Sequence, residues 1–188
     1  MAAPKFKKTK VSQQINLKEE FGFDFSGKNA LKQAIGQAII DKIVNRSKAG
    51  NGMSFGKSGI GRKVKLKSPY SKSYADSLEF KAAGKSKNKV NMSLTGDMLG
   101  LIDITKIKGN TIEIGWEDAD ENKKAFNHSV GDTVPRRPFF GVNKKELNDI
   151  KSEFKSDIKE AIKSKNNVSR KAFEDLILGL INKTKEKP

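Results

Sequence analysis

The sequence has no cysteine and only one histidine, His128, among its 188 residues. Without cysteine there are no disulfide bonds and no thiolate-bound metals, and any histidine-based catalytic or metal site would depend on His128 alone. Apolar residues make up 35% of the chain, and no apolar run approaches the length that spans a bilayer. Residues 1–10 are basic, but no apolar segment follows them, so we expect no signal peptide and no membrane partner.

Acidic residues are also few relative to basic ones. The chain has 38 Lys and Arg against 22 Asp and Glu, which gives a formal net charge of +16. This excess predicts attraction to a polyanion, a phosphate backbone or an acidic protein surface. Half of it lies within residues 50–90, where ten basic side chains accompany only Asp76 and Glu79. Because this stretch is rich in glycine, we expect a long flexible loop with a short helix beginning at Pro69.

The clearest secondary-structure signal is a β-hairpin. Apolar and polar residues alternate from Ile102 to Ile104 and again from Ile112 to Trp116, on either side of a turn at 108–110. Alternation of this kind buries one face of each strand. A hairpin alone is not stable in water, so its apolar face needs helices or further strands against it.

Two helices are expected to supply that cover. Apolar residues recur at helical spacing over 27–49, which Ser26 or Asn29 could cap, and again in a long helix that Asn143 caps with Glu146 three residues later. A last helix is expected from Ser169. These patterns predict an α+β fold in which an antiparallel β-sheet, built around the hairpin, packs against long N- and C-terminal helices.

We expect the chain to be organised in three parts. Residues 1–26 form a basic arm followed by a segment that is either a strand or an extended stretch packing its phenylalanines on the core. Residues 27–165 form the α+β domain, with the basic flexible loop over 50–90. Residues 166–188 form a C-terminal helix and a basic tail.

Known ligand and catalytic motifs fail on their spacing. Gly56-Lys57-Ser58 resembles a phosphate-binding loop, but Asn51 stands where that motif needs its first glycine. The aspartates at 118 and 120 resemble the start of a calcium loop, but Lys123 takes the place of the required glycine. No pair of carboxylates stands out for acid–base chemistry. We therefore expect a non-enzymatic protein without a cofactor or metal.

Several short motifs follow one another in a recognisable order. They are SPYSKSY at 68–74, LTGDML at 94–99, the hairpin, AFNHSVG at 125–131 and VPRRPFFG at 134–141. In this order they resemble the virion-morphogenesis and tail-completion family of tailed bacteriophages, over about residues 31–162. The resemblance implies an α+β subunit of the virion, assembled in the host cytoplasm. It also implies a ring in the phage neck, hexameric in the family, that joins the head connector or stopper to the tail tube or tail terminator.

The resemblance also implies roles for particular residues. Prolines would stiffen a segment that presents two arginines, while the following phenylalanines anchor it, although ordinary core packing explains at least one of them. The arginines could form intersubunit salt bridges or simply be exposed. Packing roles fall to Thr95, Gly96, Pro135, Pro138, Phe139 and Phe140. Subunit-interface candidates are Arg136, Arg137, Glu117, Asp118, Asp120 and Glu121, although the acidic tract could instead be a solvated loop.

The basic loop would line the lumen of the ring or dock on the next ring. Its candidate residues are Lys57, Arg62, Lys63, Lys65 and Lys67. A lumen that passes duplex DNA benefits from positive charge without base-specific contacts. The alternative is a sequence-nonspecific nucleic-acid-binding protein that grips phosphates with its arm and loop. Few aromatic residues lie among the basic ones, so a base-stacking surface is not indicated, which favours the ring.

Overall fold

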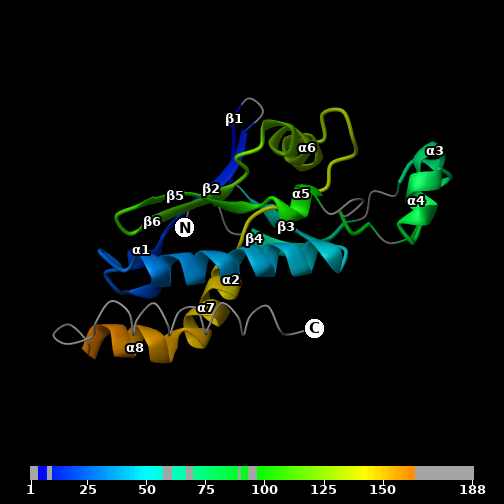
Figure 1. Cartoon of the computed structure of the whole chain (residues 1–188). Coiled ribbons are helices and arrows are strands. Elements are labelled where there is room, and N and C mark those ends of the chain that lie inside the picture. Colours follow the sequence, from blue (N-terminus) through cyan, green and yellow to red (C-terminus); the bar gives the residue numbers. More distant parts are fainter. Residues whose placement is uncertain are drawn as a thin grey trace.

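The computed structural model of the chain describes residues 4–7, 10–56, 61–66, 70–88, 90–92 and 97–163. It has the α+β fold that the sequence predicts, with an antiparallel four-stranded sheet, a separate two-stranded antiparallel sheet and several helices. In Figure 1 the long helix α2 runs below the four-stranded sheet, α6 lies above it, and α3 and α4 stand at one side.

The four-stranded sheet has the order β1-β2-β6-β5 and contains the predicted hairpin at one edge. Its strands are β1 (Lys5–Lys7), β2 (Lys10–Asn16), β5 (Asp103–Lys108) and β6 (Thr111–Gly115). Gly109 takes a positive φ of 55° in the turn between β5 and β6, as a tight hairpin turn requires. The apolar positions of β6 are almost completely buried, which confirms the hairpin and its alternation.

The N-terminal segment differs from the expected arm. β1 pairs with β2, and β2 pairs in turn with β6, so residues 10–16 occupy the interior of the sheet. Val11 and Ile15 are fully buried in the main core. A short helix, α1 (Leu17–Phe21), follows where a strand or extended segment was predicted, because Asn16 caps it by accepting from the amides of residues 18 and 19. The expected division at residue 26 is therefore not a structural boundary.

The first long helix, α2 (Asn29–Lys48), confirms the helix predicted over 27–49. Its apolar stripe, which includes Leu31, Ile35 and Ile39, is fully buried. Gly36 lies against the sheet, where a Cβ atom would overlap the end of the Ile104 side chain. The helix begins after Lys28, whose side chain makes no capping hydrogen bond, so the predicted cap at Ser26 or Asn29 was wrong.

The C-terminal helical region is two helices rather than one. α7 (Lys144–Glu153) begins with the predicted capping box, in which the Asn143 side chain and the Glu146 side chain each accept from the other's backbone amide. Phe154 then interrupts the helix, and α8 (Lys155–Lys163) follows. α7 packs against α1 and α2 rather than against the sheet. The predicted helix from Ser169 and the tail lie outside the described residues.

The described residues of the stretch 50–90 form regular structure where a flexible loop was predicted. Strands β3 (Asn51–Phe55) and β4 (Gly61–Lys65) form an antiparallel hairpin, and the Met53 amide donates to the Pro138 carbonyl oxygen at 2.7 Å. Glycine is required at Gly52 because a Cβ atom there would overlap the same carbonyl oxygen. Gly52 thus allows close packing of the backbone, which composition alone cannot distinguish from flexibility.

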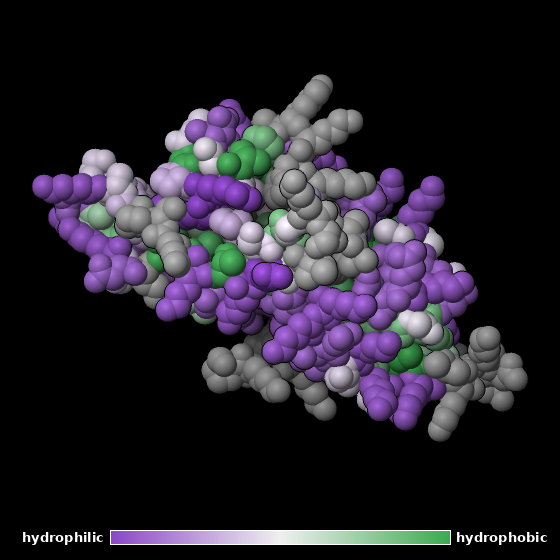
Figure 2. Space-filling view, turned by 180° about the vertical axis from the view of Figure 1, so that it is seen from behind, coloured by the Kyte–Doolittle hydropathy of each residue, from purple (hydrophilic) through white to green (hydrophobic). Residues whose placement is uncertain are grey.

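Of the remaining described helices, three are short and α6 is longer. The helix expected from Pro69 is replaced by two single-turn helices, each capped by a serine side chain at its start. These and the other two helices are α3 (Lys72–Ala75), α4 (Leu78–Ala82), α5 (Asp97–Gly100) and α6 (Ala119–Val130). Within the described ranges no helix is both long and apolar enough to cross a bilayer. Hydrophilic side chains cover most of the face shown in Figure 2.

Candidate functional site

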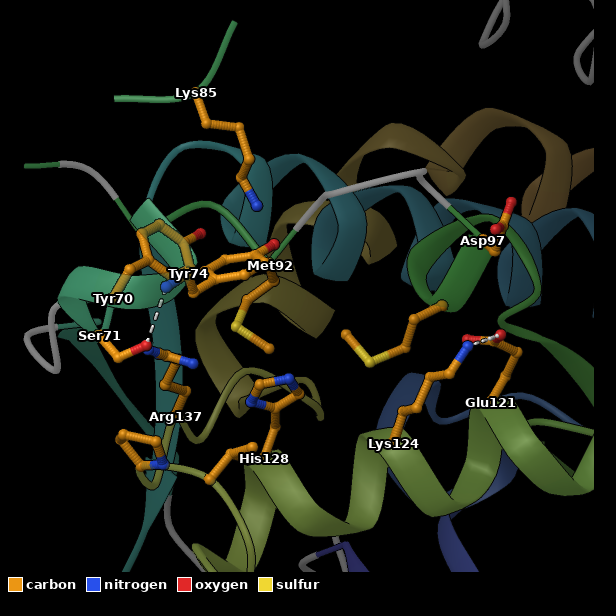
Figure 3. A pocket seen from close by; sticks show the side chains of 13 residues that line it. Tyr70, Ser71, Tyr74, Lys85, Met92, Asp97, Glu121, Lys124, His128 and Arg137 are labelled. Atoms are coloured by element: carbon orange, nitrogen blue, oxygen red, sulfur yellow. Dashed lines mark hydrogen bonds and ion pairs between the residues drawn. The ribbon is translucent and has the colours of Figure 1, made fainter. Parts of the chain in front are cut away.

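A cavity of about 510 Å³ lies between the α3–α4 region, α6 and the segment that follows α6. We call it the α6 cavity. In Figure 3 His128 and Lys124 project toward it from α6, and Lys85 extends toward it from the other side. Its lining residues are Tyr70, Ser71, Tyr74, Lys85, Met92, Asp97, Met98, Glu121, Lys124, His128, Val134, Pro135 and Arg137.

One wall of the α6 cavity is an aromatic cluster. Tyr70, Tyr74 and Phe80 contact one another with ring centroids 5.1–5.3 Å apart and with steeply inclined planes, as favourable aromatic pairs do. The ammonium nitrogen of Lys85 lies 4.7 Å from the Tyr70 ring centroid, and the guanidinium carbon of Arg137 lies 5.0 Å from the same centroid. Two cations therefore converge on one tyrosine ring at the edge of the cavity.

Helix α6 supplies the opposite wall, and its capping explains its position. The Asp118 side chain accepts from the Glu121 amide at 2.8 Å, and Gly131 ends the helix in the left-handed conformation with a φ of 81°. Glu121 and Lys124 form an ion pair one turn apart at the cavity. Glu121 is buried, and its Oε2 atom has no hydrogen-bond partner.

His128 is held neutral at physiological pH. Burial, followed by the charges of Arg137 and Lys85, lowers its pKa from 6.5 to about 4. Its Nδ1 atom is buried without a hydrogen-bond partner. Because the folded-state pKa is depressed, the unfolded chain binds more protons between about pH 6.5 and pH 4. The contribution of His128 to stability is therefore complete above pH 6.5 and is lost as the pH falls through this range.

The two arginines of the Pro-Arg-Arg-Pro-Phe-Phe segment have different environments. Arg136 is exposed, and its Nε atom donates to the Ser129 carbonyl oxygen at 3.2 Å. Arg137 has only 4% of its surface exposed, and its amide donates to the His128 carbonyl oxygen at 2.6 Å. The expectation that both arginines face a neighbour or solvent was therefore wrong for Arg137. Its guanidinium group is buried against the ring of Tyr70.

Of the packing residues predicted in this segment, the two phenylalanines fill the core and Pro135 does not. Phe139 and Phe140 are buried, and both contact the ring of Trp116, with centroid distances of 6.1 and 4.9 Å. Pro138 is half-buried and accepts the hydrogen bond from β3, whereas Pro135 is exposed at the rim of the α6 cavity. The packing roles of the two phenylalanines are thus confirmed. Thr95 and Gly96 lie outside the described residues.

The acidic tract is not the solvated loop that was considered. Asp118 caps α6, and Asp120 and Glu121 lie in its first turn, where negative charge is favourable. Glu117, Asp118 and Asp120 are exposed, but Glu121 faces the α6 cavity and is buried, so it is not an interface candidate. Within the described part of the chain, neither Glu117 nor Asp120 forms an ion pair.

The basic hairpin presents the other exposed charges. Arg62, Lys63 and Lys65 of β4 are all exposed, and none of them forms an ion pair with another described residue. The two remaining candidates of this region, Lys57 and Lys67, lie outside the described residues. The hairpin thus carries an exposed basic strand on a backbone that β3 anchors to the body at Pro138.

The α6 cavity was missed by sequence reasoning. Its residues come from separate stretches of the chain, and the motifs that contain Tyr70, Tyr74 and His128 do not indicate that these side chains meet. Among the described residues there is no group of three or more histidine and acidic side chains placed to hold a metal ion. No protein-family model, curated protein or solved structure matches the chain.

Proposed function

We propose that the chain is a non-catalytic structural subunit of a tailed-phage virion, which forms a ring with its own copies in the neck. The order of the motifs from residue 68 to residue 141 supports the neck assignment, since it resembles that of the tail-completion family. The α+β fold agrees with the subunit that this resemblance implies. In the proposed ring, the chain joins the head connector or stopper to the tail tube or tail terminator.

The proposal of self-assembly depends on two exposed groups of side chains on one chain, one acidic and one basic. Glu117 and Asp120 lie at the start of α6, and Lys63 and Lys65 lie on β4, without ion pairs to other described residues. When two different patches of one subunit are complementary, they make a head-to-tail contact, which closes into a ring if the rotation permits. Charge complementarity also fixes the orientation of such a contact.

The net charge of +16 supports the same proposal. A ring around duplex DNA must attract phosphate weakly and without sequence preference, and contacts to the backbone alone have this property. Basic side chains of β4 that do not contact a neighbour are available to face the lumen. The DNA then passes without being held at particular bases.

The test is the assembly state of the full chain by mass photometry, supplemented by sedimentation velocity at higher concentration and negative-stain microscopy. We expect closed rings that dissociate as salt is raised, because exposed charge pairs are screened. Reversal of Lys63 and Lys65 to Glu, or of Glu117 and Asp120 to Lys, should each abolish the ring. A mixture of the two variants should restore contacts, and the Lys151→Glu variant, on an exposed turn of α7, serves as control.

The outcomes separate two claims. A chain that stays monomeric at every concentration contradicts the ring itself. Rings that survive both charge reversals contradict only the pairing of the acidic start of α6 with β4. Normal rings in the Lys151→Glu variant, together with their loss in the paired reversals, are the result that supports both claims.

The exposed bases of β4 also favour a second candidate, a sequence-nonspecific nucleic-acid-binding protein. Arg62, Lys63 and Lys65 lie on a two-stranded ribbon, from which they can reach phosphates. A gel-shift titration of duplex DNA against salt distinguishes the two candidates. A nucleic-acid-binding protein gives a steep fall in affinity with salt while it remains monomeric, whereas a ring subunit gives weak retention that follows assembly.

A further inference from the structure

We propose that the α6 cavity binds a small oxyanion, a carboxylate or phosphate group carried on an apolar body. The cavity is outside the charged surfaces that support the ring, and the inference does not depend on the ring. Its size falls within the range of small-molecule pockets, which is about 300–1,000 Å³. The ligand chemistry follows from the charges and the apolar surface of the lining.

Two cations that converge on one ring define the anion-binding end. Lys85 and Arg137 lie 4.7 and 5.0 Å from the centroid of Tyr70, and both side chains line the cavity. Within the described part of the chain, Lys85 forms no ion pair with a carboxylate. Both cations act on His128, whose pKa they lower. An anion beside Lys85 would pair with an ammonium group that otherwise contacts the aromatic rings of Tyr70, Tyr74 and Phe80.

The rest of the lining favours an anion over a cation. The Oε1 atom of Glu121 pairs with Lys124, which matches the charge of this carboxylate, while its buried Oε2 atom has no hydrogen-bond partner. The cavity as a whole is lined by three cations, Lys85, Lys124 and Arg137, and by two carboxylates, Asp97 and Glu121, while His128 is neutral. His128 also lines the cavity, so a ligand bound there lies close to its imidazole ring.

The walls indicate what carries the anion. Met92, Met98, Val134 and Pro135 line the cavity and supply apolar surface that adapts to an aliphatic body. A stacked nucleobase is not favoured, because Tyr70 is already contacted by two cations and by the rings of Tyr74 and Phe80. A compact aliphatic carboxylate, free or on a side chain of a second copy of this chain, therefore suits the cavity best.

The test uses His128 as a reporter, since it is the only histidine in the chain. The imidazole carbon-bound proton signals are followed by NMR while sodium acetate or inorganic phosphate is added to the full chain at constant ionic strength. We expect a saturable shift with a Kd on the order of 1 mM, the scale for a small, efficiently bound ligand. At saturation the pKa of His128 should rise by about one or more, because a negative charge nearby stabilises the imidazolium form.

Two variants assign the effect to the cavity. Lys85→Met keeps the length of the side chain but removes its charge, and it should weaken acetate binding at least about tenfold. Lys63→Met, on the exposed basic strand β4, should bind as the parent does. No saturable shift up to about 50 mM acetate or phosphate, or an equal loss in both variants, overturns the proposal. The parent titration alone decides the question if Lys85→Met fails to fold.

A dilution series identifies the source of the anion. If the His128 signals move with protein concentration before any anion is added, and acetate reverses the movement, the carboxylate comes from a second copy. If the signals are independent of protein concentration and respond only to added acetate or phosphate, the ligand is a free anion. Both results support an oxyanion site, and neither requires a closed ring, so failure of the ring and failure of the site are distinguishable.

Discussion

Replacement of Arg46 by methionine should destabilise the protein more than any substitution of an exposed charge. Arg46 lies on α2 and is buried, with 6% of its surface exposed. Its NH1 atom donates to both carboxylate oxygens of Glu146 at 2.6 and 2.8 Å, and its NH2 atom donates to the carbonyl oxygens of Phe139 and Gly141 at 2.9 and 2.6 Å. One guanidinium thus joins α2, the segment before α7 and the first turn of α7.

The size of the effect follows from what methionine would leave behind. Two carbonyl oxygens would lose their donor in the core, and Glu146, whose side chain is only 18% exposed, would lose its counter-charge. Breaking one partner of a buried ion pair costs about 3–5 kcal/mol. Since natural domains unfold with only about 5–15 kcal/mol, this is a large part of the total. With a urea m-value of about 2 kcal/mol/M, the unfolding midpoint should fall by about 1.5–2.5 M.

The assay is urea unfolding followed by the fluorescence of Trp116, which is the sole tryptophan and is 2% exposed. Lys42→Met is the matched control, because Lys42 pairs with Glu153 at 2.9 Å on the surface, where removal costs about 0–1 kcal/mol. A cycle with Glu146→Gln isolates the coupling between Arg46 and Glu146. If Arg46→Met shifts the midpoint no more than Lys42→Met does, the buried network does not stabilise the fold and the reasoning is refuted.

Three further predictions concern the site and its supports. Stability should fall by about 3 kcal/mol between pH 6.5 and pH 4 as His128 is protonated in the unfolded chain, and His128→Gln should flatten this part of a stability–pH curve. Gly52→Ala should lower the melting temperature through overlap with Pro138, at a cost of about 1–3 kcal/mol, whereas Gly100→Ala, where a Cβ atom meets nothing within 4 Å, should not. Arg137→Ala should destabilise more than Arg136→Ala in urea, and equal effects would contradict the buried position of Arg137.

Local patterns were enough to predict several elements. The helix over 27–49, the hairpin around Gly109 and the capping box at Asn143 all appear in the structure. Each depends on interactions between residues that are close in the chain, such as the spacing of apolar residues or a side chain that bonds to a nearby amide. The burial of Phe139 and Phe140, by contrast, was predicted from the family resemblance and not from such a local pattern.

Other expectations failed where a distant contact decides the outcome. Residues 1–10 were assigned to an arm and the next segment was left open as a strand or an extended stretch, yet β1 pairs with β2, and β2 lies between β1 and β6, because pairing with Ser12 to Asn16 satisfies an otherwise open edge of the hairpin. The glycine-rich stretch was expected to be a flexible loop, yet Gly52 is needed where the backbone passes the Pro138 carbonyl group. Composition indicates that glycine permits a conformation, but only the neighbours reveal which one.

By itself the sequence determined the α+β class, the long helix, the central hairpin and the strong positive charge, because each is a sum of local preferences or of residue counts. Tertiary structure alone decided that Arg137 is buried beside Tyr70 while Arg136 is exposed, and that His128 faces Lys85 across a cavity. The physical reason is that burial and electrostatic environment depend on residues tens of positions apart, which only the folded chain brings together.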